Sequence, residues 1–297
     1  MAITINTNLS SQIVQANLNK STNALNQAIE RMTTGYKINH ASDNAAGYSI
    51  ARSWEAKLGS LDVAADNAAT GADMLSTLED HYALVSTHVQ RIRDLTEQAA
   101  NGTYGTQSKQ AIQSEIQARV DEINRIAQNC EFGGQNLMNG DLKDKSIAIQ
   151  VGLDSTEAKS QIALSGTLFK SGALADLFTA AEETVSAENI AKFCADLDTT
   201  EGEGRVSAAK MLTKIDKVIN EISSRVTTLG AAQNRIESAI ESIAVQSENI
   251  TSSLSTLRDA DVAQESSNFL KAQILQQASA TLLATANQSP SIALNLL

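Results

Sequence analysis

Apolar residues recur every three or four positions through most of this chain, which is the spacing of one face of an α-helix. The first long run covers about residues 45–100, and Asn101-Gly102 ends it. A helix of that length would extend about 80 Å at ~1.5 Å per residue, more than the diameter of a small domain. A second run at residues 112–126 predicts another helix. The N-terminal half therefore predicts rods.

The C-terminal half carries the most regular pattern. Isoleucine or leucine occupies every seventh position from Ile215 to Leu257, and a second, largely apolar series is interleaved with it. This is the a/d spacing of a coiled coil over about six heptads. Gln233 and Ser247 are polar positions in the stripe, where such residues can fix register. Because this apolar stripe must be shielded from water by the other predicted helices, we predict a two- or three-helix bundle of long antiparallel rods.

The middle of the chain, residues 141–205, has a different pattern. Apolar and polar residues alternate over 147–151 and again over 162–164, with a turn-like Gly-Leu-Asp-Ser sequence between them, which predicts one β-hairpin. A short amphipathic pattern follows at 173–198, and residues 201–204 are typical of a turn or linker. Acidic side chains outnumber basic ones two to one here, so we expect this to be the most solvated part.

The two ends of the chain resemble each other. Each is poor in charge, is rich in Asn, Gln, Ser and Thr, and carries a thin apolar stripe. Non-helical stretches at residues 35–44 and 257–261 separate these ends from the long helices. The stripe residues that we expect to make assembly contacts are Leu18, Leu25 and Met32 at the N-terminal end and Leu270, Ile274, Leu282, Leu296 and Leu297 at the C-terminal end.

These ends carry too little apolar surface to fold alone. Ordering about thirty residues costs conformational entropy that exceeds what the burial of about ten apolar side chains, many only Ala, returns. Pairing the two ends with each other would not clearly bury enough apolar surface to offset this entropy cost. We therefore expect both ends to be mostly unfolded in the monomer and to become helical when neighbouring copies bury them from several sides.

These patterns predict a mainly α fold of long antiparallel helical rods, a coiled-coil bundle, with one β-hairpin and terminal helices that are ordered on assembly. Five segments follow: an N-terminal helix and linker (1–44), the N-terminal rod helices (45–140), the hairpin with a small variable segment (141–205), the C-terminal rod helix (206–257), and a linker with the C-terminal helix (258–297).

The composition and charge of the chain argue against some classes of function. The 297 residues include one proline, so the commonest helix breaker is almost absent. The formal net charge of −11 argues against a nucleic-acid surface, which needs a basic patch, and gives no support to binding of anionic membranes. Neither the basic start of a secretory signal nor an apolar run long enough to span a membrane is visible, so these signals alone predict a cytoplasmic protein.

Residues with reactive side chains are few. Cys130 and Cys194 are too few for a disulfide framework and lack metal-ligand spacing, so we interpret them as packed or free thiols. His81 and His88 lie seven residues apart on one helical face, where surface or interface positions are favoured over a metal site. We expect no catalytic residue, no cofactor and no metal.

Several multi-residue motifs resemble bacterial flagellin, in the expected order along both ends. They are Ile5-Asn6-Thr7-Asn8, residues 28–39, Asp43-Asn44-Ala45-Ala46-Gly47, residues 90–95 and residues 98–103 in the N-terminal half, and residues 229–235, Arg258-Asp259-Ala260-Asp261 and residues 276–297 in the C-terminal half. The resemblance covers about residues 1–140 and 205–297.

The resemblance implies a self-assembling subunit of the flagellar filament used for swimming, in a short form without large outer domains. Its terminal helices would form an inner tube and its long helices the next shell. It implies export through the flagellar type III apparatus without a cleaved signal peptide, and an extracellular location. The implied partners are further copies of the chain, an export chaperone, the filament cap and hook-junction proteins.

The resemblance also implies recognition by Toll-like receptor 5, because common flagellins bind that receptor through a patch on the long helices. The matching positions are Arg91, Leu95 and Glu115. A guanidinium, an apolar side chain and a carboxylate could together form a small hot spot.

Three other roles compete with the filament subunit. A hook–filament junction protein would keep similar ends but assemble in few copies. An enzyme would need a concave site of convergent polar groups, which rods do not offer. A general coiled-coil scaffold would stay inside the cell.

Overall fold

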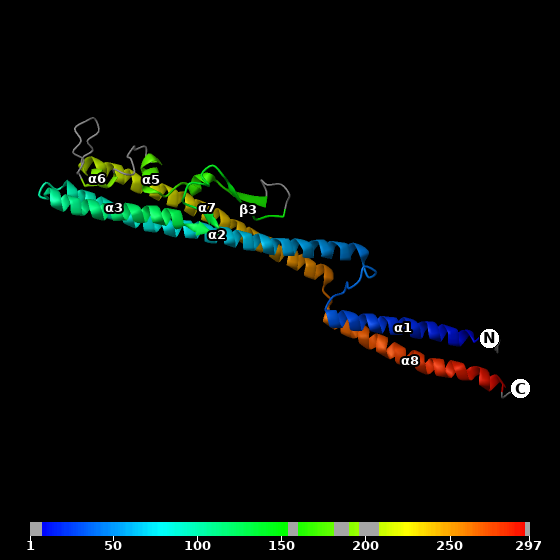
Figure 1. The fold of residues 1–297 in the computed structure, drawn as a ribbon. Coiled ribbons are helices and arrows are strands. Elements are labelled where there is room, and N and C mark those ends of the chain that lie inside the picture. The colour runs from blue at the N-terminus through cyan, green and yellow to red at the C-terminus, as the bar shows by residue number, and fades with distance from the viewer. Residues whose placement is uncertain (1–7, 154–159, 181–189, 196–207, 295–297) are drawn as a thin grey trace. The chain divides into compact units, whose positions relative to one another are not determined.

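The computed structural model describes residues 8–153, 160–180, 190–195 and 208–294, and these are mainly helical (Figure 1). The long helices are α1 (Leu9–Thr34), α2 (Ala45–Ala100), α3 (Thr106–Asn129), α7 (Ala208–Arg258) and α8 (Val262–Leu294). The short elements are β1 (Glu131–Phe132), β2 (Gln135–Asn136), β3 (Ile147–Gln150), β4 (Gln161–Leu164), the 3-10 helix η1 (Gly166–Phe169), α5 (Leu174–Ala180) and α6 (Ile190–Cys194).

The chain divides into two compact units. Unit 1 comprises Met1–Gly59 and Ser247–Leu297, and unit 2 comprises Ser60–Gln246. Helices α2 and α7 each contribute residues to both units. The predicted fold class, long antiparallel helices with a hairpin, is confirmed.

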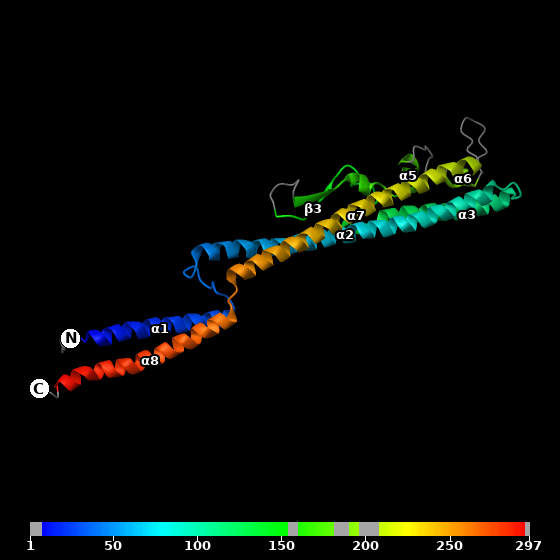
Figure 2. The same cartoon turned by 180° about the vertical axis from the view of Figure 1, so that it is seen from behind.

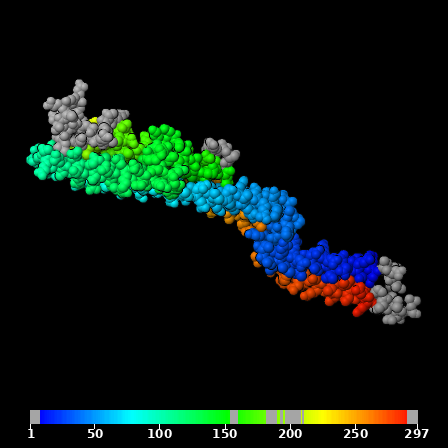
Figure 3. Space-filling view, viewed as in Figure 1, coloured from blue at the N-terminus to red at the C-terminus, as the bar shows by residue number. Residues whose placement is uncertain are grey.

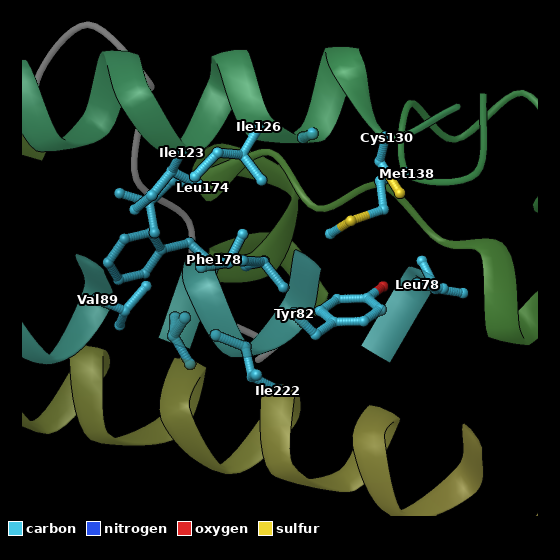
Figure 4. Packing of buried hydrophobic residues seen from close by; sticks show 14 of the residues in the cluster. Leu78, Tyr82, Val89, Ile123, Ile126, Cys130, Met138, Leu174, Phe178 and Ile222 are labelled. Atoms are coloured by element: carbon cyan, nitrogen blue, oxygen red, sulfur yellow. The ribbon is translucent and has the colours of Figure 1, made fainter. Parts of the chain in front are cut away.

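Unit 2 holds a continuous apolar core between α2, α3 and α7. Figure 4 shows Tyr82 and Val89 of α2, Ile123 of α3 and Ile222 of α7 converging on this core. The polar pairs on its edges give the direction of the helices, because Glu79 of α2 pairs with Gln233 and Arg93 of α2 pairs with Asp216. As the residue number increases along α2, the number of its partner in α7 decreases, so the two helices run antiparallel.

The seam predicted in α7 faces this core. Ile215, Ile222, Leu229 and Ile236 are buried in it, and Ile243 is buried as well. The last two members of the predicted stripe, Ile250 and Leu257, are only half-buried. The polar position Gln233 has a partner, since its Nε2 donates to Glu79 Oε2 at 2.9 Å. A hydrogen bond across a largely apolar interface favours one register, as the sequence predicted for this residue.

One arginine lies inside the same core. Arg225 is 7% exposed and donates from Nε to Glu221 Oε1 at 2.9 Å and from its NH1 nitrogen to the Ser171 carbonyl at 2.8 Å. The same NH1 nitrogen donates to the Tyr82 hydroxyl at 3.3 Å, and that hydroxyl donates to the Lys170 carbonyl. Burial raises the pKa of Tyr82. These contacts fix the segment before α5 against α2 and α7.

The predicted β-hairpin is present. Strands β3 and β4 pair antiparallel, with Ile147 opposite Leu164 and Gln150 opposite Gln161, and residues 154–159 lie outside the described part. A second antiparallel pair, β1–β2, was not predicted. Its strands have only two residues each, which is too short for an alternation of apolar and polar residues to be recognised on either side of Gly133 and Gly134. Both glycines have positive φ values, 58° and 81°, which side chains other than glycine rarely adopt.

The amphipathic pattern at 173–198 is described in part. Residues 174–180 form α5 and residues 190–194 form α6. The remainder of the pattern, and the predicted linker at 201–204, lie outside the described residues.

In unit 1, helices α1 and α8 lie side by side, as Figures 2 and 3 both show. Asn8 caps the start of α1 by accepting the Ser11 N–H, and Gly35, at φ 75°, ends it by donating to the Arg31 carbonyl. Asp261 caps α8 by accepting the Ala263 N–H at 2.8 Å. Both ends are therefore helical here. Their unfolding in a lone subunit stays a prediction.

We predict that Gly166→Ala destabilises unit 2. The added Cβ would collide with the backbone carbonyl oxygens of Lys143 and Lys145, so the chain around η1 must shift, at a cost of about 1–3 kcal/mol. Gly230→Ala is the matched control, because open space surrounds Gly230 within α7 and alanine should add about 0.5–1 kcal/mol there. Thermal unfolding followed by circular dichroism measures both changes. Equal stability of the two variants would contradict this packing.

Candidate functional site

The candidate site is the surface of α1 and α8, which we call the terminal helix pair. The helices run antiparallel, with polar contacts distributed along their length. Near the linkers, Arg31 pairs with Glu265 at 3.3 Å. Further along, Gln276 Nε2 donates to the Thr22 hydroxyl at 3.3 Å. At the far end, Asn8 Nδ2 donates to the Ala286 carbonyl at 2.7 Å. Hydrogen bonds between partly exposed side chains contribute little net stability, so they set register more than they hold the pair together.

The residues that the pair buries are small or polar. Among its described residues, the buried apolar side chains are Ala28 and Ala272, which are accompanied by Glu265 and Ser279. An alanine methyl group brings far less hydrophobic stabilisation than a leucine or isoleucine side chain. The contact between α1 and α8 is therefore an incomplete core.

The large apolar residues of the pair face solvent instead. Ile274 is 64% exposed and Leu282 is 58% exposed, although they lie in a helix packed along one side. Of the predicted assembly residues, Met32, Leu270, Ile274 and Leu282 are exposed, Leu18 and Leu25 are half-buried, and Leu296 and Leu297 lie outside the described residues. Leu9, Ile13, Ile29, Val262 and Leu275, which were not on that list, are exposed as well. Several large exposed apolar side chains on the same pair of helices are a feature expected of an interaction surface.

A groove of about 710 Å³ runs between the two helices. Its lining combines alanine and leucine side chains with the cations Lys20, Arg31 and Lys271 and the anion Glu265. Within the described part of the chain, Arg31 Nε is buried without a hydrogen-bond partner. This surface therefore leaves large apolar side chains exposed and one buried nitrogen without a hydrogen-bond partner.

The second candidate surface carries the positions matched to receptor binding. Arg91 of α2 donates from Nε and from its NH2 nitrogen to Glu115 Oε1 of α3, at 3.0 and 2.9 Å, and both side chains are partly exposed. Leu95 is only 2% exposed and belongs to the core of unit 2. The structure thus brings Arg91 and Glu115 together at the surface but does not present Leu95 beside them.

The histidines and cysteines do not gather into a metal-binding group in the part of the chain that the structure describes. No group of three or more His, Cys, Asp or Glu side chains there could hold a metal ion. Cys130 and Cys194 are buried free thiols, and burial raises their pKa values to about 11 and about 12. None of the described helices is long and apolar enough to cross a membrane.

Comparison with known proteins gives one consistent result. The model of the bacterial flagellin N-terminal helical region matches residues 5–143, and that of the bacterial flagellin C-terminal helical region matches residues 195–297. A flagellin of Bacillus subtilis is 35% identical, with 99% of each chain covered. Flagellin B of Vibrio cholerae is 33% identical, with 100% of each chain covered.

Among solved structures, one described as a flagellar hook-associated protein from Vibrio parahaemolyticus superposes with a TM-score of 0.58. It covers 73% of this chain and 100% of that one, at 14% sequence identity. That likeness is one of fold alone.

We predict that both thiols resist alkylation in the folded protein. A raised pKa lowers the thiolate fraction at any given pH, so at pH 8 the thiolate population of Cys130 falls on the order of a hundredfold below that of an unfolded cysteine. Burial adds a steric barrier. Mass spectrometry after iodoacetamide treatment should find both residues unlabelled in buffer and fully labelled in urea. Equal labelling under the two conditions would contradict the buried positions.

Proposed function

This chain belongs to the bacterial flagellin family, whose members are structural subunits that self-assemble into the extracellular flagellar filament, and we propose that the exposed apolar side chains of its terminal helix pair are the surface through which it polymerises. The single observation that carries this proposal is that α8 exposes Leu270, Ile274 and Leu282 while its contact with α1 buries mainly alanine-sized groups.

The distribution of apolar residues supports burial by more than one neighbour. Along α8, Ile274 and Leu275 are adjacent and both exposed, so they point to different sides of the helix. A helix that is apolar around its circumference is stable only when it is enclosed. A single partner could cover one side. Contacts that repeat head to tail without closing build an open helical polymer and supply neighbours on several sides.

The alternative role is a hook–filament junction protein. We favour the main filament, because the chain aligns over nearly its full length with flagellins at 35% and 33% identity, whereas its likeness to a hook-associated protein is one of fold at 14% identity. We further propose export through the flagellar type III apparatus, with an export chaperone, the filament cap and hook-junction proteins as partners. Family membership supports these partners.

A second proposal is recognition by Toll-like receptor 5. What favours it is the exposed pair of Arg91 and Glu115, which places a guanidinium and a carboxylate of two helices next to each other. Charged groups on a rigid helical surface can pair with complementary groups of a partner. Leu95 lies beneath this surface, so it would support the pair from the core rather than contact the receptor.

We predict that Ile274→Gln and Leu282→Gln each block polymerisation. If each side chain is buried between copies, losing it removes about 1.5–3 kcal/mol per contact, which raises the monomer concentration needed for growth about tenfold or more. Gln277→Ala is the control in the same helix, because Gln277 is an exposed polar residue. Seeded growth followed by light scattering and electron microscopy measures the effect. Growth of both glutamine variants at the wild-type concentration would refute this surface.

We predict that Arg91→Ala and Glu115→Ala each weaken receptor signalling about tenfold or more in a Toll-like receptor 5 reporter assay, since each removes one charge of the exposed pair. Arg125→Ala is the matched control, because Arg125 forms an exposed ion pair with Glu122 on the same helix as Glu115. If Arg125→Ala reduced signalling as much as the other two variants, the loss would reflect a general effect of charge and would contradict a specific receptor-binding patch.

A further inference from the structure

The sequence Asn-Gly occurs twice in this chain, at Asn101-Gly102 and at Asn139-Gly140. The side-chain amide of an asparagine can react with the backbone nitrogen of the next residue, and a glycine in that place leaves the nitrogen unhindered because it has no Cβ. Both pairs lie in unit 2, the first in the turn that joins α2 to α3 and the second just after β2 (Figure 1). The same dipeptide therefore occurs in two different surroundings of one folded unit.

The Asn101 side chain is bent over the nitrogen that would attack it. Its Oδ1 accepts the Thr103 backbone N–H at 3.1 Å, which closes a ring of atoms that includes the Gly102 nitrogen. The Thr103 hydroxyl donates to the same oxygen, also at 3.1 Å. Two donors thus converge on Oδ1, where negative charge develops when a nucleophile adds to the amide carbon. This is the arrangement of an oxyanion hole.

The turn also leaves the reacting groups accessible. Asn101, Gly102 and Thr103 are all exposed, and nothing lies within 4 Å of the position that a Cβ on Gly102 would occupy. In the described part of the chain, the contacts of the Asn101 side chain are made by its Oδ1, so its amide nitrogen is not held in place. Both the attack by the Gly102 nitrogen and the departure of the amide nitrogen are therefore sterically open.

Asn139 has the opposite electrostatic surroundings. Its Oδ1 accepts the Asp141 backbone N–H at 2.9 Å, but its Nδ2 donates to the Asp141 carboxylate. The carboxylate holds the amide nitrogen in place, and its charge opposes a second negative charge on the adjacent Oδ1. The attacking side is also fixed, because Gly140 has a φ of 88°, packs close to Ser171 and accepts the Lys143 N–H with its carbonyl.

We propose that Asn101 is a site of spontaneous chemical modification, at which Gly102 and Thr103 promote conversion of the side-chain amide to a carboxylate with water as the co-reactant. The fold protects Asn139 from the same reaction. The reaction requires no second copy of the chain, so it is independent of the polymerisation proposed above.

The reaction proceeds in two steps. The Gly102 nitrogen gives its proton to water and forms a bond to Asn101 Cγ, while the two Thr103 donors stabilise the negative charge on Oδ1. The bond from Cγ to Nδ2 then breaks, and this nitrogen takes up a proton and leaves as ammonia. The product is a cyclic imide that contains the Gly102 nitrogen. Water opens this ring at either carbonyl carbon, which gives aspartate or isoaspartate at position 101.

Either product changes the end of α2. A carboxylate at position 101 lies next to the last carbonyl groups of α2, where the helix dipole disfavours negative charge. Isoaspartate also adds a methylene group to the main chain of this turn. The turn is tied to α2 through Tyr104, whose N–H donates to the Asn101 carbonyl at 3.3 Å and whose hydroxyl accepts from Gln98 at 3.0 Å. We therefore expect the modified chain, which ion exchange separates by its added negative charge, to unfold at a lower temperature.

The two Asn-Gly pairs are matched controls for each other. The folded monomer and the same protein in urea are incubated in one buffer, and peptide mass spectrometry follows aspartate and isoaspartate at both positions. In the folded monomer we expect Asn101 to react about tenfold or more faster than Asn139, because a protected segment reacts only when it opens. In urea the two rates should agree within about threefold, since glycine follows both residues.

Two results would overturn the proposal. One is equal modification of Asn101 and Asn139 in the folded monomer. The other is a difference in urea as large as that in the folded monomer, because the surroundings in the fold would then not be its cause.

Substitution of Thr103 tests the hydroxyl donor. Thr103→Val keeps the shape of the side chain and the backbone N–H, and we expect it to slow modification of Asn101 in the folded monomer about threefold or more and to leave the rate in urea unchanged. Thr103→Ser should restore most of the rate. Thr87→Val is the matched control, because the exposed Thr87 hydroxyl donates to the Ala83 carbonyl within α2.

Circular dichroism should show that all three variants are folded under the conditions of the assay. Reaction of folded Thr103→Val at the wild-type rate, or equal slowing by Thr87→Val, would overturn the role of the Thr103 hydroxyl.

Discussion

The described residues of α1 and α8 leave large apolar side chains uncovered in a single subunit, and we propose that this constraint determines how the subunit functions. In unit 2, leucine and isoleucine side chains from three long helices enclose one another, and residues such as Leu75 and Ile116 are fully buried. In the terminal helix pair the buried apolar side chains are alanines, accompanied by Glu265 and Ser279, while Ile274 and Leu282 are exposed. Hydrophobic stabilisation follows the apolar area removed from water, so we expect the first set of helices to be stable by itself and propose that the second needs neighbours.

The contrast extends to polar groups. Gln233 and Arg225 lie in or beside a complete core and have partners within the same unit. The terminal pair leaves Arg31 Nε without a partner among the described residues, and its groove is lined by three cations and one anion. The two linkers of unit 1 satisfy some of their backbone groups through each other. We propose that a subunit built in this way reserves most of its terminal surface for other copies.

Much of the fold could be predicted because periodicity reports burial. The absence of proline from residues 45–100 and the Asn101-Gly102 stop predicted the length and the end of α2, and the heptad spacing identified the buried face of α7 in unit 2. Periodicity carries no information on which distant residues meet, so the pairing of Tyr36 with Asp259, and Arg258 with Glu55, was missed. Arg258 is the one basic residue between Arg235 and Lys271, and this was the available signal. Likewise Leu95 was matched to a receptor patch by sequence position, which does not report that its side chain points inward.

The most direct measurement is amide hydrogen exchange of α1 and α8 compared between the monomer and the assembled polymer. We expect residues 9–34 and 262–294 to exchange rapidly in the monomer, most rapidly far from the linkers, and to become strongly protected in the polymer. The buried face of α2 in unit 2 should be protected equally in both. Full protection of both terminal helices in the monomer would show that these helices do not depend on neighbouring copies for burial.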